Sequence, residues 1–337
     1  MDPALDGRQA DDDLTARVVE ALAGEGVLGQ GVTVGLSGGV DSIALLDLFC
    51  RIREQDSSSF PVLAAIHVHH GLSLNADDWL AFCARVCRER DVAFDAVRVV
   101  VDAQSGSGRG LGPEGAARAA RYQAFQRVAT PNLALAHHRD DQAETVLHQL
   151  LRGTGWKGAA GMAYVRTLGP KLRLIRPLLC LTRVELLAYA TRRRLEWIED
   201  ESNSDTTMLR NYLRHEILPG IEARFPQYRD ALARMARLAA ETDLMLEELA
   251  RIDLQWCGEE AEAGALDALP RARQVNALYH WLGANGIPAP AQAQLEEWAR
   301  QLFRPQPAGK VHQAGGHELT ILRKGSRMIL RRGVKTG

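Results

Sequence analysis

The stretch VTVGLSGGVDSIALLDLF, residues 32–49, combines a short apolar strand, a turn rich in Ser and Gly, and an apolar helix. Unpaired backbone N–H groups and the helix dipole make a helix N-terminus a binding site for anions. Gly38 and Gly39 let the backbone turn tightly beside a phosphate, and Ser37 and Ser42 can add hydroxyl donors. The glycine spacing differs from a dinucleotide loop, and the lysine of a Walker A loop is absent. The stretch therefore predicts a phosphate-binding turn of another kind.

Asp41, in the middle of this turn, distinguishes a phosphate site from an ordinary strand-to-helix turn. Ser and Gly are common in such turns, so they do not exclude the ordinary interpretation. A carboxylate, however, repels phosphate unless a Mg²⁺ ion or a proton mediates between them. The presence of Asp41 is therefore informative.

Strand-like and helix-like segments alternate from residue 32 to about residue 200. Apolar runs rich in Val, Ile, Leu and Ala, separated by amphipathic helices, predict a parallel sheet covered on both faces. The expected strands are 32–36, 61–69, 93–101 and 132–137, with 173–179 as a fifth strand or a linking segment. The expected helices begin at Ser42 and cover about 76–90, 113–129, 140–152 and 182–194. Beyond residue 205 the pattern is helical, up to a Lys-Gly-Ser turn that predicts a terminal hairpin.

Composition and charge indicate a globular protein of two or three domains. Of the 337 residues, 46% are hydrophobic and 25% are charged. The acidic N-terminus predicts no signal peptide, and no apolar run is long enough to span a membrane. The five cysteines lack C-x-x-C spacing, so buried, inert thiols in a reducing cytoplasm are expected. The net charge of −1 hides a basic segment, 304–337, which fits either a solvated surface or a phosphate-rich partner.

Asp140, Asp141 and Glu144 fall within one helical turn after the strand at 132–137. Acids in a first turn are favoured by the helix dipole, so capping is the simple explanation. Three carboxylates beside two histidines are more than a cap requires. Other polar motifs have equally simple alternatives: HVHH at 67–70 fits surface histidines or a metal site without a full ligand set, and Arg118 with Arg121 fits an exposed basic helix face.

Taken together, these motifs resemble a known family. SGGVDS resembles the PP-loop of the N-type ATP pyrophosphatases, which cleave ATP between the α- and β-phosphates. The ordered set SGGVDS, HVHHGLS, EGAAR, AHH-x-DDQ-x-ET and RG-x-G-x-x-G, followed by RN-x-LR at 210–214, resembles the tRNA(Ile)-lysidine synthetase family. The resemblance is strong over residues 32 to about 220 and weaker beyond. The additional C-terminal domain of longer members is expected to be absent.

The resemblance implies an α/β fold in which a parallel-sheet PP-loop ATPase domain (Rossmann-like, adenine nucleotide α-hydrolase-like) precedes a mainly helical second domain. The implied divisions are an N-terminal extension with a first helix (1–30), the catalytic domain (31–208), a helical connector (209–250) and a mainly helical tRNA-recognition domain that ends in a hairpin (251–337).

The resemblance also implies a reaction. ATP adenylates O2 of the wobble cytidine in the CAU anticodon of an isoleucine tRNA, and pyrophosphate leaves. The ε-amine of lysine then attacks C2 and expels AMP, which changes decoding from AUG to AUA. The implied cofactors are ATP, as a substrate, and Mg²⁺; the implied partners are this tRNA and free lysine. A cytoplasmic ligase without a membrane partner is expected, and a homodimer stays open.

Site residues carry over from the matching motifs. ATP binding is expected at Ser37, Gly38, Gly39, Val40, Asp41, Ser42 and His67, with Asp41 also as the Mg²⁺ ligand. Lysine binding is expected at Asp140, Asp141 and Glu144, which with Asp41 are the candidate catalytic residues. Which carboxylate takes the proton from lysine is left open. Binding of tRNA is expected at Arg118, Arg121, Arg210, Asn211 and Arg214.

Three alternatives compete with this function. PP-loop enzymes that thiolate a tRNA base use reactive cysteine pairs, which this sequence lacks. Amidating relatives need an ammonia source, and the sequence shows no N-terminal cysteine nucleophile. A non-catalytic nucleotide-binding protein is compatible with the fold, but it leaves the acidic trio and the RN-x-LR segment without a role.

Overall fold

The computed structural model describes residues 3–71, 73–99, 112–199, 209–264, 266–288, 290–303, 311–315 and 319–332. The chain forms two compact units, residues 1–236 and 237–337, each with a hydrophobic core. No helix in the described ranges combines the length and the hydropathy that a bilayer span requires.

The first unit is built on a six-stranded sheet. Its strands are β1 Val32–Gly35, β2 Leu63–His69, β3 Ala93–Arg98, β4 Asn132–Ala134, β5 Val165–Leu168 and β6 Leu172–Ile175. Their order is β3-β2-β1-β4-β6-β5, and all are parallel except β5, which pairs antiparallel with β6. The predicted parallel α/β sheet is confirmed, with β6 as the fifth strand of the prediction. The sequence analysis missed β5, because a four-residue, half-exposed edge strand is too short to show alternation.

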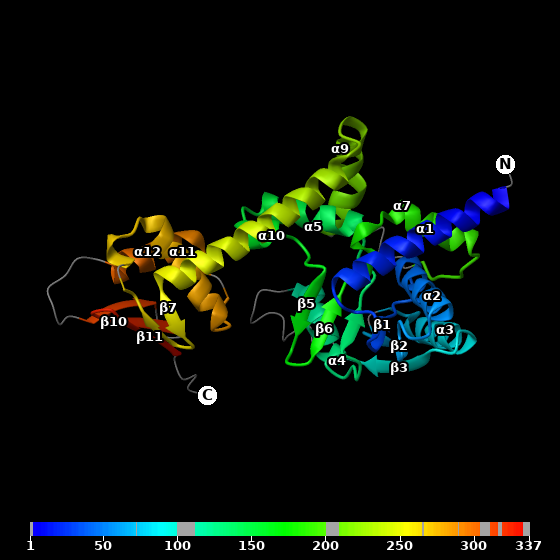
Figure 1. The fold of residues 1–337 in the computed structure, drawn as a ribbon, viewed down its shortest axis with the longest axis horizontal. Coiled ribbons are helices and arrows are strands. Elements are labelled where there is room, and N and C mark those ends of the chain that lie inside the picture. Colours follow the sequence, from blue (N-terminus) through cyan, green and yellow to red (C-terminus); the bar gives the residue numbers. More distant parts are fainter. Residues whose placement is uncertain are drawn as a thin grey trace. The chain divides into compact units, whose positions relative to one another are not determined.

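Helices cover both faces of this sheet (Figure 1). Helices α1 Pro3–Gly24, α2 Val40–Gln55, α3 Ala76–Glu89 and α7 Arg183–Arg192 contribute to the core on one face, and α4 Gly112–Phe125 packs on the other. Most of α2 is buried, since its apolar side chains lie all round the helix. Its one deeply buried acid, Asp47, accepts hydrogen bonds from Tyr189 Oη at 2.7 Å and Arg193 Nε at 3.1 Å, and these tie α7 to α2.

The strand order reverses at β1, which lies between β2 and β4. Helix α2 follows β1 and helix α5, Arg139–Leu151, follows β4, so both helices begin at the carboxyl edge of the sheet. In open α/β sheets the crevice at such a switch point is where ligands bind. The topology therefore brings the Ser- and Gly-rich turn and the acidic first turn of α5 to one place.

The remaining helices of the first unit are short, apart from the last. They are α6 Trp156–Ala159, the 3₁₀ turn η2 Pro177–Cys180, α8 Leu209–Tyr212, the π-helical turn η4 Leu213–Ile217, α9 Leu218–Arg224 and α10 Tyr228–Asp253, which continues into the second unit. Single π-helical turns are rare and frequently lie at functional sites.

The second unit packs two helices on a five-stranded antiparallel sheet of order β7-β8-β11-β10-β9. Its elements are β7 Gln255–Cys257, β8 Glu260–Glu262, η5 Leu266–Ala268, α11 Arg271–Ala284, α12 Gln292–Leu302, β9 Val311–Gly315, β10 Leu319–Lys324 and β11 Arg327–Arg332. Strands β10 and β11 form a hairpin in the segment where one was predicted. The other three strands, which extend this hairpin into a sheet, were not predicted, because strands of three to five residues are too short to reveal their period.

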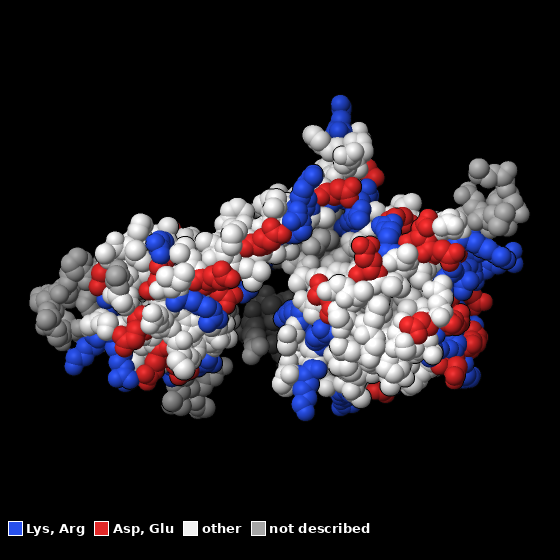
Figure 2. Space-filling model, in the orientation of Figure 1, with Lys and Arg blue, Asp and Glu red and all other residues white. Residues whose placement is uncertain are grey.

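Most described arginines of the basic segment hold this second unit together. Arg323 is buried and donates to both carboxylate oxygens of Asp267 at 2.6 Å and to the carbonyl of Leu302. Two further pairs join Arg327 to Glu260 at 2.9 Å and Arg332 to Glu259 at 3.2 Å. On the face drawn in Figure 2, acidic and basic side chains accordingly alternate over this unit rather than forming one basic surface.

The cysteines are free thiols. Cys50, Cys83 and Cys87 are buried as predicted, and burial raises the pKa of the Cys83 and Cys87 thiols to about 12. Cys180 is half-buried and Cys257, on the short strand β7, is exposed, so the prediction of buried thiols was wrong for Cys257.

Candidate active site

The turn between β1 and α2 leaves the first N–H groups of α2 open to an anion. Its N-cap residue, Gly39, makes no side-chain cap. Gly38 has φ +94°, a backbone conformation that strains any residue with a Cβ, and a Cβ there would also push Cδ1 of Ile198 aside from 2.7 Å. Ser42 shapes the turn from within: its hydroxyl accepts from Gly38 N at 3.1 Å and donates to Gly39 O at 2.9 Å. The Ser37 hydroxyl donates to Ser42 Oγ at 3.1 Å, so the predicted phosphate-binding residues form one folded unit.

Asp41, in the first turn of α2, has a carboxylate oxygen that lacks a partner. Its Oδ1 is buried without a hydrogen bond to any described residue, while Oδ2 lies 3.7 Å from Nε2 of His138. Buried polar oxygens are nearly always satisfied, so an unpartnered one suggests a ligand atom or ion. No group of three or more His, Cys, Asp or Glu residues that could hold a metal exists within the described ranges. A metal at Asp41 would therefore depend on oxygens from a ligand.

His138 connects this turn to α5. It is the N-cap of α5 in a reciprocal capping box, in which its Nδ1 accepts from Asp141 N at 3.3 Å and Asp141 Oδ2 accepts from His138 N at 3.1 Å. Its Nε2 lies 3.4 Å from Asp141 Oδ2. Burial acts to lower the pKa of His138, but the neighbouring carboxylates of Asp41 and Asp141 outweigh burial and raise it. His138 thus lies among three carboxylates, since its Nδ1 is also 3.7 Å from Oδ2 of Asp140; when the ring is protonated, Nδ1 no longer accepts from Asp141 N.

Arg214, on the π-helical turn η4, binds both Asp141 and Glu144. Its Nε donates to Glu144 Oε1 at 2.6 Å, and its Nη2 donates to Glu144 Oε2 and to Asp141 Oδ1, both at 3.0 Å. The Glu144 side chain is only 3% exposed. Burial raises the pKa of Glu144, and the Arg214 guanidinium offsets only part of this effect. Asp141 and Glu144 therefore form a pocket for a cation, and in this structure Arg214 fills it.

Asp140 faces away from this pocket, toward α7 and α10. Its Oδ2 accepts from Arg183 N at 2.8 Å and its Oδ1 accepts from Arg229 Nε at 2.5 Å. Burial acts to raise the pKa of Asp140, but these two donors outweigh it and lower the pKa. The structure thus separates the three acids that the sequence placed in one helical turn: two share a cation, and the third holds neighbouring elements together.

The predicted tRNA contacts fall into two groups. Arg210 lies beside α5, the helix that carries Asp141 and Glu144, and its Nη2 donates to Thr145 Oγ1 at 3.2 Å. Asn211, the next residue of α8, is also engaged by a partner. Arg118 and Arg121 are exposed on α4: Arg118 donates to the hydroxyl of Tyr122 at 3.3 Å and lies over its ring, and Arg121 donates to Nε2 of His70 at 3.3 Å.

Two predicted nucleotide-binding side chains lie beneath the turn rather than on it. His67 is buried, and its Nδ1 lies 2.8 Å from the carbonyl of Leu36, the residue that opens the turn. Burial lowers the pKa of His67, so the ring is neutral and holds the backbone of the turn. The side chain of Val40 is part of the apolar core, which leaves only its backbone N–H for a ligand.

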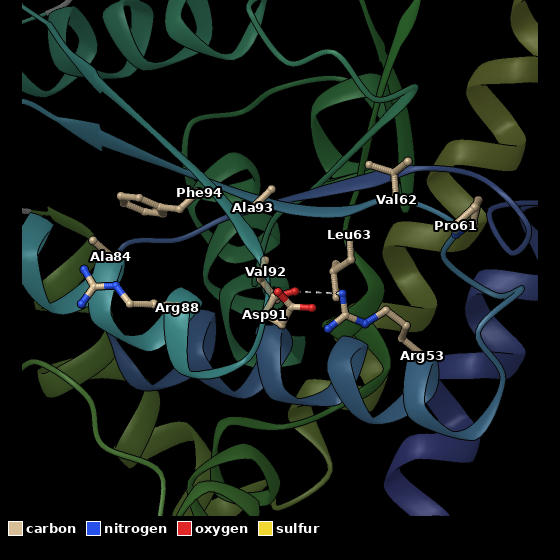
Figure 3. Close-up of a pocket in the computed structure, with 10 residues that line it drawn as sticks. All are labelled: Arg53, Pro61, Val62, Leu63, Ala84, Arg88, Asp91, Val92, Ala93 and Phe94. Carbon is tan, nitrogen blue, oxygen red and sulfur yellow. Dashed lines mark hydrogen bonds between the residues drawn. The ribbon is translucent and has the colours of Figure 1, made fainter.

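A cavity of about 700 Å³ lies elsewhere, at the amino ends of β2 and β3, and is shown in Figure 3. Leu63 lines it and pairs with Val32, whereas the Ser- and Gly-rich turn follows Gly35 at the other end of β1. Arg53 closes one side by donating to the carbonyls of Arg90 and Asp91. The cavity therefore lies at the opposite edge of the sheet from the candidate site.

Comparison with known proteins agrees with this geometry. A family model described as a PP-loop domain matches residues 13–221. The chain belongs to the PP-loop family. A second family model, described as a TilS substrate binding domain, matches residues 262–328.

Two relatives of this PP-loop protein carry the name tRNA(Ile)-lysidine synthase. The protein from Chromobacterium violaceum is 48% identical over 270 residues, which are 80% of this chain and 61% of that protein. The protein from Pseudomonas fluorescens is 46% identical over 261 residues, 74% of this chain and 57% of that protein. The resemblance to tRNA(Ile)-lysidine synthetases is therefore confirmed, and the chain spans about three-fifths of the length of these curated relatives.

Among solved structures, the U34-tRNA thiolase NcsA from Methanococcus maripaludis, determined with its [4Fe-4S] cluster, superposes with a TM-score of 0.57 at 21% identity. The match covers 69% of this chain and 80% of that chain, and it supports the PP-loop fold alone.

Sequence reasoning missed two residues of this PP-loop site. In the sequence His138 stands out only as a neighbour of the acids, because His is not among the residues that usually cap a helix N-terminus. Arg229 gives no signal, because its contact with Asp140 spans 89 residues of sequence.

Proposed function

We propose that this PP-loop protein ligates lysine to C2 of the wobble cytidine in an isoleucine tRNA with a CAU anticodon, using ATP. One observation carries the proposal: His138 joins a phosphate-type turn with an unpartnered Asp41 oxygen to the cation pocket of Asp141 and Glu144. An adenylating enzyme that uses an amine needs these two sites side by side. The names of the relatives support the choice of amine and acceptor.

In the first step the turn would bind the phosphates of ATP. The open N–H groups of α2 and the Ser37 hydroxyl would hold the leaving pyrophosphate while O2 of the cytidine forms a bond to the α-phosphorus. The free oxygen of Asp41 fits a ligand role toward Mg²⁺, which binds proteins through one or two carboxylates plus substrate phosphates. When bound there, Mg²⁺ would supply charge neutralisation for the pyrophosphate.

In the second step Asp141 and Glu144 would hold the ε-ammonium of lysine. The Arg214 guanidinium already shows that these carboxylates accept N–H donors from a single cation. Since both oxygens of Glu144 are engaged by Arg214, lysine binding at this position requires Arg214 to move. We propose Glu144 as the base, because its raised pKa brings it closer to the working pH than an ordinary carboxylate. The neutral amine then attacks C2, the C2–O bond breaks, and AMP leaves with the oxygen.

We assign catalysis to residues 31–208, a connecting role to 209–250 and tRNA recognition to 251–337. The match to a TilS substrate binding domain supports the last assignment. On the first unit, Arg118, Arg121 and Arg210 are the proposed contacts with tRNA, and Arg214 would exchange its carboxylates for RNA phosphate. We further propose a cytoplasmic location, where the three substrates occur together, and a homodimer, to be tested by sedimentation.

The proposed function is tested by incubating the protein with ATP, Mg²⁺, labelled lysine and tRNA. Label should enter only tRNA that carries a CAU anticodon with an unmodified wobble cytidine, and one pyrophosphate should be released for each lysine incorporated. A matched tRNA with a U in place of the wobble C is the control. Absence of lysine transfer by folded protein that binds ATP would remove the proposal, and transfer of sulfur instead would favour a thiolase.

A further inference from the structure

The connection between α5 and α6 is exposed to solvent, and it has no role in the proposed reaction. Every residue from Leu151 to Lys157 is exposed. Trp156 is 48% exposed, and Leu150 and Leu151 are 40% and 69% exposed. The indole N–H of Trp156 makes no hydrogen bond to any described residue. We call residues 150–157 the Trp156 surface; it includes most of the RG-x-G-x-x-G motif.

The backbone of the Trp156 surface is held in one conformation. Gly153 has φ +66° and ends α5 in a Schellman arrangement, with Gly153 N donating to Leu150 O at 3.0 Å and Thr154 N to Gln149 O at 3.2 Å. The Thr154 hydroxyl also donates to Gln149 O at 3.0 Å. Trp156 then opens the short helix α6, whose turn is closed by Ala160 N donating to Trp156 O at 2.8 Å. The exposed indole is therefore presented on a fixed backbone.

The Asp, Glu, Lys and Arg residues in the sequence around this surface are all basic. Residues 145–184 contain no Asp or Glu, but they contain seven Lys and Arg residues. Two of these, Arg152 and Lys157, flank Trp156, are exposed and make no side-chain hydrogen bond or ion pair with a described residue. A lone solvated cation is common, but two unpaired cations beside an exposed aromatic ring are the combination that binds single-stranded nucleic acid.

We propose that the Trp156 surface is an RNA-stacking platform for the anticodon arm of the substrate, with one unpaired base on the indole of Trp156 and backbone phosphates at Arg152 and Lys157. The inference rests on the proposed function and says where the tRNA substrate would lie on the protein. Helix α5 sets the geometry: ten residues separate Asp141 from Leu151, a rise of about 15 Å. The platform would thus hold a nucleotide that is a few positions away from the reacting cytidine.

The test measures binding of a synthetic CAU anticodon stem-loop RNA to the full chain. Trp156→Ala should weaken binding about 5- to 150-fold, the range expected for the loss of one stacked base, whereas Trp156→Phe should retain most of the affinity. The double variant Arg152→Ala/Lys157→Ala should reduce the slope of log K against log salt by about 1.4, because two phosphate contacts are lost. Arg88→Ala, an exposed cation at the opposite edge of the sheet, is the matched control and should leave the slope unchanged.

ATP binding should be unaffected in all variants, which separates a local effect from misfolding. If wild-type protein binds the RNA and Trp156→Ala binds it equally well, the platform is refuted while the proposed function stands. A change of oligomeric state with unchanged RNA affinity would also refute it and would indicate a protein interface. Failure of the wild type to bind this RNA or the intact tRNA would instead overturn the proposed function itself.

Discussion

Replacing Arg214 by Ala should make the stability of the protein depend on pH in a specific direction. The substitution removes all three hydrogen bonds that Arg214 donates to Glu144 and Asp141. It leaves Glu144, whose side chain is 3% exposed, as a buried carboxylate without its hydrogen-bonded cation, although the charge of Arg210 still acts on it. Breaking a buried ion pair from one side typically costs about 3–5 kcal/mol. Because the Arg214 side chain is itself 26% exposed, we expect a smaller cost than for a fully buried pair, about 2–3 kcal/mol at neutral pH.

The sign of the pH dependence follows from the pKa of Glu144. Burial already raises this pKa above its unfolded value, and the loss of Arg214 raises it further. At pH values between the pKa of Glu144 in the unfolded state and its higher pKa in the folded state, the native state binds more protons than the unfolded state. Stability therefore falls as the pH rises through that range. Each further unit by which the pKa of Glu144 rises in the folded state increases this loss of stability by about 1.4 kcal/mol. Relative to wild type, Arg214→Ala should therefore lose less stability at pH 5.5 than at pH 7.5.

Urea denaturation of the ligand-free protein, followed by circular dichroism at both pH values, measures this effect. Arg237→Ala is the matched control, because Arg237 forms an exposed pair with Glu241 four residues on; it should change stability by less than about 0.5 kcal/mol at either pH. In the double variant Arg214→Ala/Glu144→Gln the extra pH dependence should disappear. If the free energy of unfolding depended on pH in the same way for Arg214→Ala and wild type, Glu144 would not be a buried carboxylate that Arg214 stabilises.

Three further predictions concern the reaction. Glu144→Gln should lower lysine transfer by about 10²- to 10⁴-fold while pyrophosphate release on tRNA persists, measured in parallel assays; equal loss of both would exclude Glu144 as the base of the second step. Asp41→Asn should abolish pyrophosphate release, and near-normal release at saturating Mg²⁺ would contradict its role at the nucleotide. Gly38→Ala should weaken ATP binding at least tenfold in a filter-binding assay, because a Cβ strains the backbone at φ +94° and displaces Ile198; unchanged binding would contradict this account of the turn.

Local features of the site were predictable from sequence, since they depend on residues close together in the chain. The strand, turn and helix at 32–49 show their apolar periodicity and their Gly-Gly turn directly, and the structure has them at nearly the predicted positions. The same holds for the acids at the start of α5. What sequence could not show is which way each side chain points. Asp140 and Asp141 are adjacent, yet one binds Arg229 and the other binds Arg214, both provided by segments 70 or more residues away.

Charge counting is limited for the same reason, because it does not show which charges are paired. The segment 304–337 is strongly basic in sequence, and a phosphate-rich partner was one interpretation. In the structure Arg323, Arg327 and Arg332 are each matched to an acid that lies 56 or more residues earlier. A composition count treats these arginines as free, whereas ion pairing within the unit removes much of their positive potential. Unpaired cations can be identified only once the fold is known, and two of those in the first unit, Arg152 and Lys157, lie in a stretch with no acid at all.

Helix α5 explains why the acidic and the basic surfaces are found on one element. A helix carries a partial positive charge at its N-terminus and a partial negative charge at its C-terminus, which stabilise acids and cations respectively. Asp141 lies in the first turn of α5 and Arg152 is its C-cap, so each charge lies where the helix dipole favours it. The same rigid helix, about 20 Å long, would then fix the distance between the amine that reacts and the RNA that accepts it. A change in the length of α5 should therefore separate the two functions, leaving lysine binding and RNA binding intact while ligation is lost.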